Sequence, residues 1–377
     1  MLMLTLGSSS SILSSVHFAA FYHRASLVTL AYRYSCLISF LPSIIASPST
    51  ADSSHHPPFP LHSRSIAMQS LPCIETVPLR HSHTGSGGPS SLKRLHFESL
   101  PSTQRWAQER FDRLLEEGLS PSQWVLVSAA NQTDGIGTYD IRLRDNRRWY
   151  SPGGNVHATF VAAWPSEKRH LLFHVPQVTT LAVAHTLDTF GIPSQVKWVN
   201  DVLLDGHKVC GVLCNAPGLT IQDAGETYSS LLVGIGINVN DRGDADSDYA
   251  THVRDQRVTS VNRYRASSGQ PPVTAEDIVQ QLQHRVCGAI TQLMAEGFAP
   301  FLPMLNARLA YRGQPIAIDM DGDVREGVLE GLNADGSLRL RTATGSVETY
   351  VTGRIVKNGT MMANSGGAQK RTVERTS

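Results

Sequence analysis

The spacing of apolar residues after Leu95 has the periods of helices and strands, and it predicts an ordered α+β region. Apolar positions at helical spacing predict helices that begin after Ser102, at Pro176, after Thr274 and near Phe301. Apolar runs bounded by turn residues predict strands at 124–130, 155–164, 195–199 and 231–240. The polar stretch 241–272 predicts a loop-rich insertion.

The pattern changes at Gln314 to short strands separated by turns. The candidate strands are 315–319, 324–330, 337–341 and 347–351, and the segment 333–336 supplies turn residues. Short strands in this arrangement predict a small β-barrel. Helices, strands and this small C-terminal β-barrel together predict an α+β fold class.

The N-terminal part differs in composition from the rest of the chain. It is rich in Ser, His and Pro, and Asp52 is the only acidic residue before Glu75. Acid-poor, Ser-rich and Arg-bearing N-termini are typical of organelle transit peptides. A disordered extension, or a true start at Met68, is the alternative. We predict a leader or disordered extension at 1–92, a larger folded domain at 93–310, the barrel at 311–358 and a disordered tail at 359–377.

Net charge and cysteine content indicate which partners and which compartment to expect. The chain has 377 residues, a formal net charge of +1 and 41% hydrophobic residues. A charge this close to zero gives no reason to expect nucleic-acid binding. The 5 cysteines form no disulfide framework, which favours a reducing compartment. Cys210 and Cys214 lack a second pair at metal-ligand spacing, so we expect buried strand thiols.

The segment from 197 to 211 combines a turn signal with charged side chains. Asp-Gly at 205–206 lies between two apolar runs, and it predicts a type I′ hairpin because both central positions need positive φ. Such a hairpin would hold Lys197, Asn200, Asp201 and Lys208 as a catalytic platform. Two ammonium groups near one acid can bind a carboxylate or a phosphate. An amphipathic hairpin with solvated lysines is the alternative.

Three further segments suit a nucleotide. The glycine pair in "QTDGIGT" can let backbone N–H groups approach a phosphate. In "RRWYSPGGN", Arg147 and Arg148 could hold a polyphosphate while Trp149 stacks on a base. In "GIGINVN", Asn238 could read an adenine edge or a ribose. An ordinary glycine loop, a solvated basic loop and a strand-end turn are the respective alternatives.

Taken in this order, the segments resemble those of biotin protein ligases, also called holocarboxylase synthetases. "KWVNDVLLDGHKVCGVL" is similar to the family's K-W-P-N-D hairpin and the strand after it, and "RRWYSPGGNV" to its R-x-W-x-S-P-x-G-N segment. "GIGINVN", "LPSTQRW" and "VTSV" are similar to its G-x-G-I-N, D-S-T-N and A-T-S-L motifs. "EGLNADGSLRL" resembles part of its small β-barrel, so the resemblance covers about 95–357.

The resemblance implies a catalytic domain with a mixed or antiparallel central sheet flanked by helices. It also implies adjoining biotin and nucleotide sites. The implied biotin-binding residues are Ser102, Thr103, Gln104, Gln132, Gly135, Lys208 and Gly211. The implied ATP- or AMP-binding residues are Gly137, Thr138, Arg147, Trp149, Asn155 and Asn238. The implied catalytic cluster is Lys208, Lys197, Asp201 and Asn200. In this cluster, Lys208 would hold the biotin carboxylate and later the acyl-adenylate carbonyl.

The resemblance also implies a reaction and its partners. Biotin would be activated with ATP and Mg²⁺ to biotinyl-5′-AMP and then transferred to a lysine of an acceptor. The implied acceptors are biotin carboxyl carrier domains of acetyl-CoA, propionyl-CoA or related carboxylases. For this chain we expect no nucleic-acid partner and no stable membrane span. We expect a cytoplasmic enzyme, with a mitochondrial or other organellar location open because of the acid-poor leader. The oligomeric state and the metal ligands stay open.

The sequence departs from the family pattern at three places. The family's glycine loop reads G-R-G-R, whereas 135–138 carry no arginine, so we expect the basic role to move along the loop toward Arg147. Val199 replaces the hairpin proline, and the N-terminal region shows no helix-turn-helix. A lipoate or octanoate ligase or transferase is the runner-up. A catalytically silent biotin-binding regulator is the further alternative.

Overall fold

The computed structural model describes residues 72–79, 91–111, 114, 123–140, 145–218, 220–223, 225–240 and 257–356. For residues 139–140, 145–147 and 220–223 it describes the backbone alone. Most of the predicted leader and the whole predicted tail lie outside these ranges.

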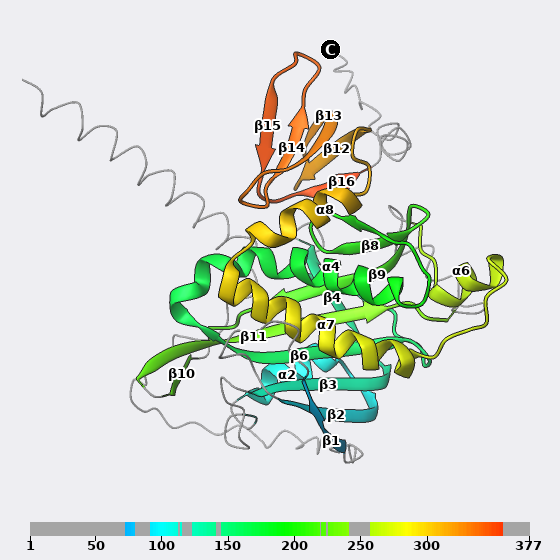
Figure 1. The fold of residues 1–377 in the computed structure, drawn as a ribbon, viewed down its shortest axis with the longest axis vertical. Helices are drawn as coiled ribbons and strands as arrows, with labels where there is room; N and C mark the ends of the chain where they lie inside the picture. The colour runs from blue at the N-terminus through cyan, green and yellow to red at the C-terminus, as the bar shows by residue number, and fades with distance from the viewer. Residues whose placement is uncertain are drawn as a thin grey trace, which may run out of the picture. The chain divides into compact units, whose positions relative to one another are not determined.

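A nine-stranded mixed sheet forms the centre of the larger domain (Figure 1). The strand order is β1-β2-β3-β6-β11-β9-β8-β7, and β10 pairs with β11. The strands are β1 (Cys73–Pro78), β2 (Ser91–Leu100), β3 (Gln123–Gln132), β6 (Val156–Pro165), β7 (Gln195–Lys197), β8 (Asp201–Leu204), β9 (His207–Asn215), β10 (Thr220–Asp223) and β11 (Glu226–Ile237). β2 and β3 run parallel, and the other pairings described in this sheet are antiparallel. The predicted fold class is therefore confirmed.

Helices pack on this sheet, and the four that the sequence predicts begin within one residue of their expected starts. α4 (Val175–Asp188) and α7 (Ala275–Glu296) pack together, and α2 (Thr103–Glu109) contacts β3, β6 and β11 (Figure 1). The other helical elements are η1 (Ser166–His174), α6 (Val261–Ser267), η3 (Ala299–Phe301) and α8 (Leu302–Arg308). Ser102 caps α2 by accepting a hydrogen bond from the Arg105 amide, and Thr274 and Asp277 form a capping box at the start of α7.

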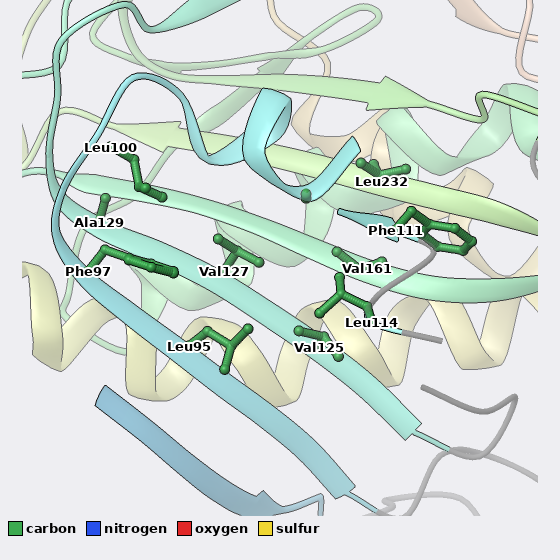
Figure 2. Packing of buried hydrophobic residues seen from close by; sticks show 11 residues of the cluster. Leu95, Phe97, Leu100, Phe111, Leu114, Val125, Val127, Ala129, Val161 and Leu232 are labelled. Carbon is green, nitrogen blue, oxygen red and sulfur yellow. The ribbon is translucent and has the colours of Figure 1, made fainter. Parts of the chain in front are cut away.

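An apolar cluster fills the space between the α2 segment and the sheet (Figure 2). Alternate side chains of a strand point to opposite faces, so Val125, Val127 and Ala129 of β3 all point into this cluster, which also contains Phe111. Trp124, one position out of phase with them, is also buried. Burial on both faces explains why the sequence shows one continuous apolar run there.

The structure corrects three sequence predictions. Order begins before Leu95, since β1 lies inside the predicted leader and pairs with β2. β1 is an almost fully exposed edge strand, so no apolar alternation marks it. α6 occupies part of the predicted loop at 241–272, because Ser260 caps it by accepting from the Arg263 amide. The loop before Trp149 contains a two-stranded ribbon, β4 (Ile136–Asp140) with β5 (Asp145–Arg148).

The C-terminal domain is a second, five-stranded antiparallel sheet. Its order is β15-β14-β13-β12-β16. The strands are β12 (Pro315–Met320), β13 (Asp323–Leu332), β14 (Leu338–Arg341), β15 (Val347–Tyr350) and β16 (Arg354–Val356). The predicted strands are confirmed, and the short β16 is additional. In the described part of the chain, no pairing joins the edge strands β15 and β16, so the predicted barrel is observed as a sheet.

The two sheets meet at β7 and α4. Leu309, just after α8, forms a parallel bridge with Val196 of β7, and the Ala310 amide donates to the Val196 carbonyl over 2.9 Å. The Gly336 carbonyl of the C-terminal sheet accepts hydrogen bonds from the Trp198 indole (3.1 Å) and the Gln177 amide (3.2 Å). The domains are therefore joined by backbone and side-chain contacts. None of the helices in the described ranges is long and apolar enough to cross a membrane.

His174, at this junction, predicts a pH-dependent stability. Its ring stacks on Phe298 with centroids 4.1 Å apart, its Nδ1 has no hydrogen-bond partner among the described residues, and burial lowers its pKa to about 4. The unfolded chain therefore binds a proton near pH 6.5, but the folded chain does so only near pH 4. We expect the free energy of unfolding to fall by roughly 2–3 kcal/mol from this histidine as pH drops through that window.

Denaturant titrations between pH 7 and pH 4 measure this effect. His174→Gln should flatten the slope, because the variant has no group there that gains a proton on unfolding. Equal slopes for wild type and His174→Gln would contradict the assignment.

Candidate active site

The predicted type I′ hairpin is present between β8 and β9. Asp205 and Gly206 have φ values of 48° and 76°, as that turn requires. The preceding segment differs from the prediction of one strand at 195–199. β7 ends at Lys197, a turn of three residues follows, and β8 pairs back so that Lys197 lies opposite Asp201. This second reversal brings both residues beside the hairpin.

A charged cluster results from these two reversals. Lys208 Nζ lies 2.5 Å from Asp201 Oδ1, and Lys197 Nζ lies 3.9 Å from Asp201 Oδ2. The side chains of Lys197, Asp201 and Lys208 are 10%, 12% and 20% exposed. Two cations thus share one carboxylate in a poorly hydrated place, which leaves positive charge available to an anionic ligand. Burial and the nearby Asp201 carboxylate raise the pKa of Tyr311, a residue that sequence reasoning missed.

Asn200 fixes the turn to β9. Its side-chain amide donates to the Val212 carbonyl over 2.9 Å and to Thr138 Oγ1 over 3.3 Å, and its carbonyl accepts from the Val212 amide. Through Thr138, it also connects the hairpin to the β4–β5 ribbon. Asn200 therefore holds backbone in place.

Trp149 lies over a floor of two glycines. Gly211 of β9 and Gly236 of β11 are paired across the sheet. A methyl group at Gly236 would lie 2.5 Å from Cε2 and Nε1 of Trp149, and one at Gly211 would lie 3.0 Å from Cζ3. Lys208 Nζ is 5.4 Å from the centroid of the indole. The glycines thus allow a large flat ring to lie beside the Lys208 ammonium group.

A polar network lies at the start of α2. The Thr103 amide and hydroxyl donate to Gln132 Oε1 over 2.8 and 3.1 Å, and the Gln132 amide donates to Ser151 Oγ over 2.8 Å. The Thr159 hydroxyl is 3.0 Å from both Thr103 Oγ1 and Gln104 Oε1. Ser102, Thr103 and Gln104 are each at least 95% buried. Polar groups this well enclosed can orient a ligand that has both polar and apolar edges.

The other predicted ligand-binding residues lie in different surroundings from one another. Gly135 is packed against Trp149 and Ser151, because a methyl group there would lie 2.3 Å from the Trp149 carbonyl. Asn155 accepts from the amides that follow β11, at Val239 (2.7 Å) and Asn240 (2.9 Å). Asn238 donates to the Thr259 carbonyl over 3.1 Å. Asn155 and Asn238 therefore shape the end of β11.

The remaining predicted residues belong to the ribbon. Gly137 and Thr138 lie on β4, and Thr138 reaches the hairpin through Asn200. Arg147 lies on β5, but its side chain is outside the described part of the structure. The sequence reasoning missed Thr159, Ser151 and Trp198. Ser151 lies inside the quoted segment "RRWYSPGGN" and Thr159 follows that segment on β6, but no local signal connects Trp198 with its distant acceptor.

The described residues hold no group of three or more His, Cys, Asp and Glu side chains arranged to bind a metal ion. Asp201 alone, held by two lysines, does not make a complete Mg²⁺ site, which usually needs substrate phosphates as further ligands. No described cysteine forms a disulfide, and burial raises the pKa of the Cys210 thiol, as expected for an inert strand residue.

Comparisons with known proteins agree with this arrangement. Residues 97–238 match the biotin/lipoate A/B protein ligase family, and residues 312–357 match the biotin protein ligase C-terminal domain. The chain is 31% identical over 234 residues to a biotin--[acetyl-CoA-carboxylase] ligase of Paracoccus denitrificans, covering 61% of this chain and 89% of that protein. It is 26% identical over 260 residues to the bifunctional ligase/repressor BirA of Bacillus spizizenii, covering 68% of this chain and 71% of that protein.

A solved structure agrees at the level of the fold. It is the biotin protein ligase from Aquifex aeolicus in complex with biotin and ATP, with a TM-score of 0.52 and 24% sequence identity. The match covers 70% of this chain and 97% of that one. The likeness thus extends over nearly the whole length of the solved chain.

Proposed function

This chain belongs to the biotin protein ligase family, and we propose that its charged hairpin joins biotin to AMP and passes it to a carrier lysine. The observation that carries the proposal is the placement of Lys208 and Lys197 around Asp201, beside the Trp149 ring. A cation in a poorly hydrated site is suited to a carboxylate that must react with a polyanion.

In the first step, a carboxylate oxygen of biotin attacks the α-phosphorus of ATP. The bond from that phosphorus to the bridging oxygen breaks, and pyrophosphate leaves with its electron pair. Lys208 holds the carboxylate and offsets the charge that builds up near it. Magnesium, if it accompanies ATP, would be held by phosphate oxygens with Asp201 as a protein ligand.

In the second step, the neutral ε-amine of an acceptor lysine attacks the acyl carbon of biotinyl-5′-AMP. The bond from this carbon to the phosphate oxygen breaks, and AMP leaves. The amine must lose a proton, and we propose Asp201 as its acceptor or orienter. The nucleophile comes from the acceptor, so the enzyme needs no serine, cysteine or histidine nucleophile.

The acceptor is a biotin carrier domain of a carboxylase, and we propose the carriers of acetyl-CoA or propionyl-CoA carboxylases as its substrates. The formal net charge of +1 is close to zero and gives no reason to propose nucleic acid as a further partner. We propose a cytoplasmic location, with an organelle as the alternative that the acid-poor N-terminus favours. Mapping the N-terminus of the mature protein from cells would separate the two.

Acceptor mass tests the function directly. The protein is incubated with ATP, biotin, lipoate and a carrier domain, and the carrier is weighed. We expect the mass of one biotinyl group. A lipoyl group would establish the runner-up, and an unchanged mass with retained biotin binding would establish the silent regulator. Neither alternative is favoured by the relatives, which are biotin ligases.

The glycine floor gives a prediction about nucleotide binding. Gly236→Ala would place a methyl group 2.5 Å from the Trp149 indole, so the ring must move. Overpacking of this kind costs about 1–3 kcal/mol, and we expect the KM for ATP to rise by about tenfold. Gly288→Ala on α7 is the matched control, since nothing lies within 4 Å of a methyl group there. An unchanged KM for ATP would show that the ring position does not matter.

A further inference from the structure

The turn between β7 and β8 is held at both ends by different parts of the molecule. At its C-terminal end, Asn200 exchanges hydrogen bonds with Val212 of β9, inside the central sheet. At its N-terminal end, Trp198 follows Lys197 directly, and its indole donates to the Gly336 carbonyl over 3.1 Å. Trp198 is only 3% exposed, so its indole N–H has little access to water as an alternative acceptor.

The acceptor belongs to a rigid turn of the C-terminal sheet. The Gly336 amide donates to the Asn333 carbonyl over 2.9 Å, and the Asn333 amide donates to the Ser337 carbonyl over 2.8 Å. Asp335 Oδ1 accepts from the Ser337 amide over 3.0 Å. Because these hydrogen bonds join residues of the turn to one another, the turn holds the Gly336 carbonyl in one fixed position.

Glycine is required at position 336. Its φ is 75°, a value that L side chains rarely adopt. A methyl group there would also lie 2.7 Å from Gln177 Nε2 and 3.0 Å from His174 Nδ1. The turn backbone is therefore packed directly against α4 and η1 while its carbonyl reaches Trp198.

We propose that Trp198 and Gly336 are positioning residues, through which the C-terminal domain fixes the Lys197–Asp201 turn for catalysis. The indole ties the residue after Lys197 to the C-terminal sheet, and Lys197 lies opposite Asp201 in the β7–β8 pairing. Loss of the indole bond would leave that end of the turn held through β7 alone. The inference deepens the proposed ligase function and rests on it.

Gln177 supplies a matched control. Its side chain donates to the same Gly336 carbonyl over 3.2 Å. Gln177, however, lies on α4, and neither of its neighbours in the sequence is a proposed catalytic residue. Gln177→Met keeps the size of the side chain and removes that donor. It should weaken the domain junction about as much as Trp198→Phe does, without acting on the turn.

The experiment separates positioning from folding. The burst of pyrophosphate without acceptor counts active sites, and the rate of carrier biotinylation is then divided by that count. For Trp198→Phe, we expect kcat per active site to fall about fivefold to tenfold, the value of one hydrogen bond. The KM for biotin should stay within about twofold, because Lys208 lies on β9 rather than on the turn.

For Gln177→Met, kcat per active site should stay at the wild-type value while the melting temperature falls. Gly336→Ala is the second variant, since it displaces the acceptor without changing Trp198, and its kcat per active site should fall as well. Equal kcat values per active site for Trp198→Phe and Gln177→Met would overturn the inference. A smaller pyrophosphate burst in Trp198→Phe with an unchanged kcat per active site would overturn it too. Wild-type protein that fails to biotinylate the carrier would instead overturn the proposed function.

Discussion

Lys208→Gln is expected to lower biotin-dependent pyrophosphate release by about 10²–10³-fold. The glutamine keeps a donor, on a side chain that is one atom shorter, but loses the full charge that meets the biotin carboxylate. Because the wild-type ammonium group is only 20% exposed, water cannot replace that charge efficiently. Initial rates of pyrophosphate release at saturating ATP measure the effect.

Lys168→Gln is the control for this substitution. Lys168 donates to the Met294 carbonyl over 2.8 Å and has no contact with the hairpin cluster among those described. Its pyrophosphate release should equal that of wild type. A wild-type rate in Lys208→Gln would mean that another cation meets the biotin carboxylate.

Asp201→Asn should reduce both stability and transfer. Removal of the carboxylate takes away the counter-charge that two ammonium groups share, on side chains that are 10% and 20% exposed. Unpairing a well-buried ion pair costs about 3–5 kcal/mol, so for this partly exposed cluster we expect a loss of about 2–3 kcal/mol in the free energy of unfolding. Transfer from preformed biotinyl-5′-AMP should slow by about 10²-fold, as expected for loss of a general base.

Asp188→Asn gives the comparison. Asp188 Oδ2 also lies 2.5 Å from its partner, Arg308, but the Asp188 side chain is 36% exposed and lies outside the cluster. We expect a stability loss below about 1 kcal/mol and an unchanged transfer rate. Single-turnover transfer and denaturant unfolding measure the two quantities. If transfer survives in Asp201→Asn, the carboxylate serves to hold the lysines and another group takes the proton.

The parts of the fold that follow from local pattern were predictable. The apolar run 124–130, the capping signals at Ser102 and Thr274 and the Asp-Gly turn each depend on neighbours within a few residues. Segments whose structure depends on distant partners were not. Strand β1 exists because it pairs with β2, and the β4–β5 ribbon contains a register shift that disguises it.

The same division applies to the site. The proximity of Lys208 to Asp201 follows from a short hairpin, so sequence spacing could predict it. The packing of Trp149 on Gly211 and Gly236 requires β9 and β11 to be neighbours. The bond from Trp198 to Gly336 spans 138 residues between two domains. Contacts of this kind are set by tertiary structure and leave no periodic trace.

Strand β1 limits how far the N-terminus can be trimmed without damage. All six of its residues pair with β2. Without β1, β2 would be the edge strand of the sheet, paired only with β3. Proteolysis after Pro78 would uncover a row of unpaired amides and carbonyls, a template for pairing between molecules and for precipitation. Recombinant versions for crystallisation should therefore begin upstream of Cys73.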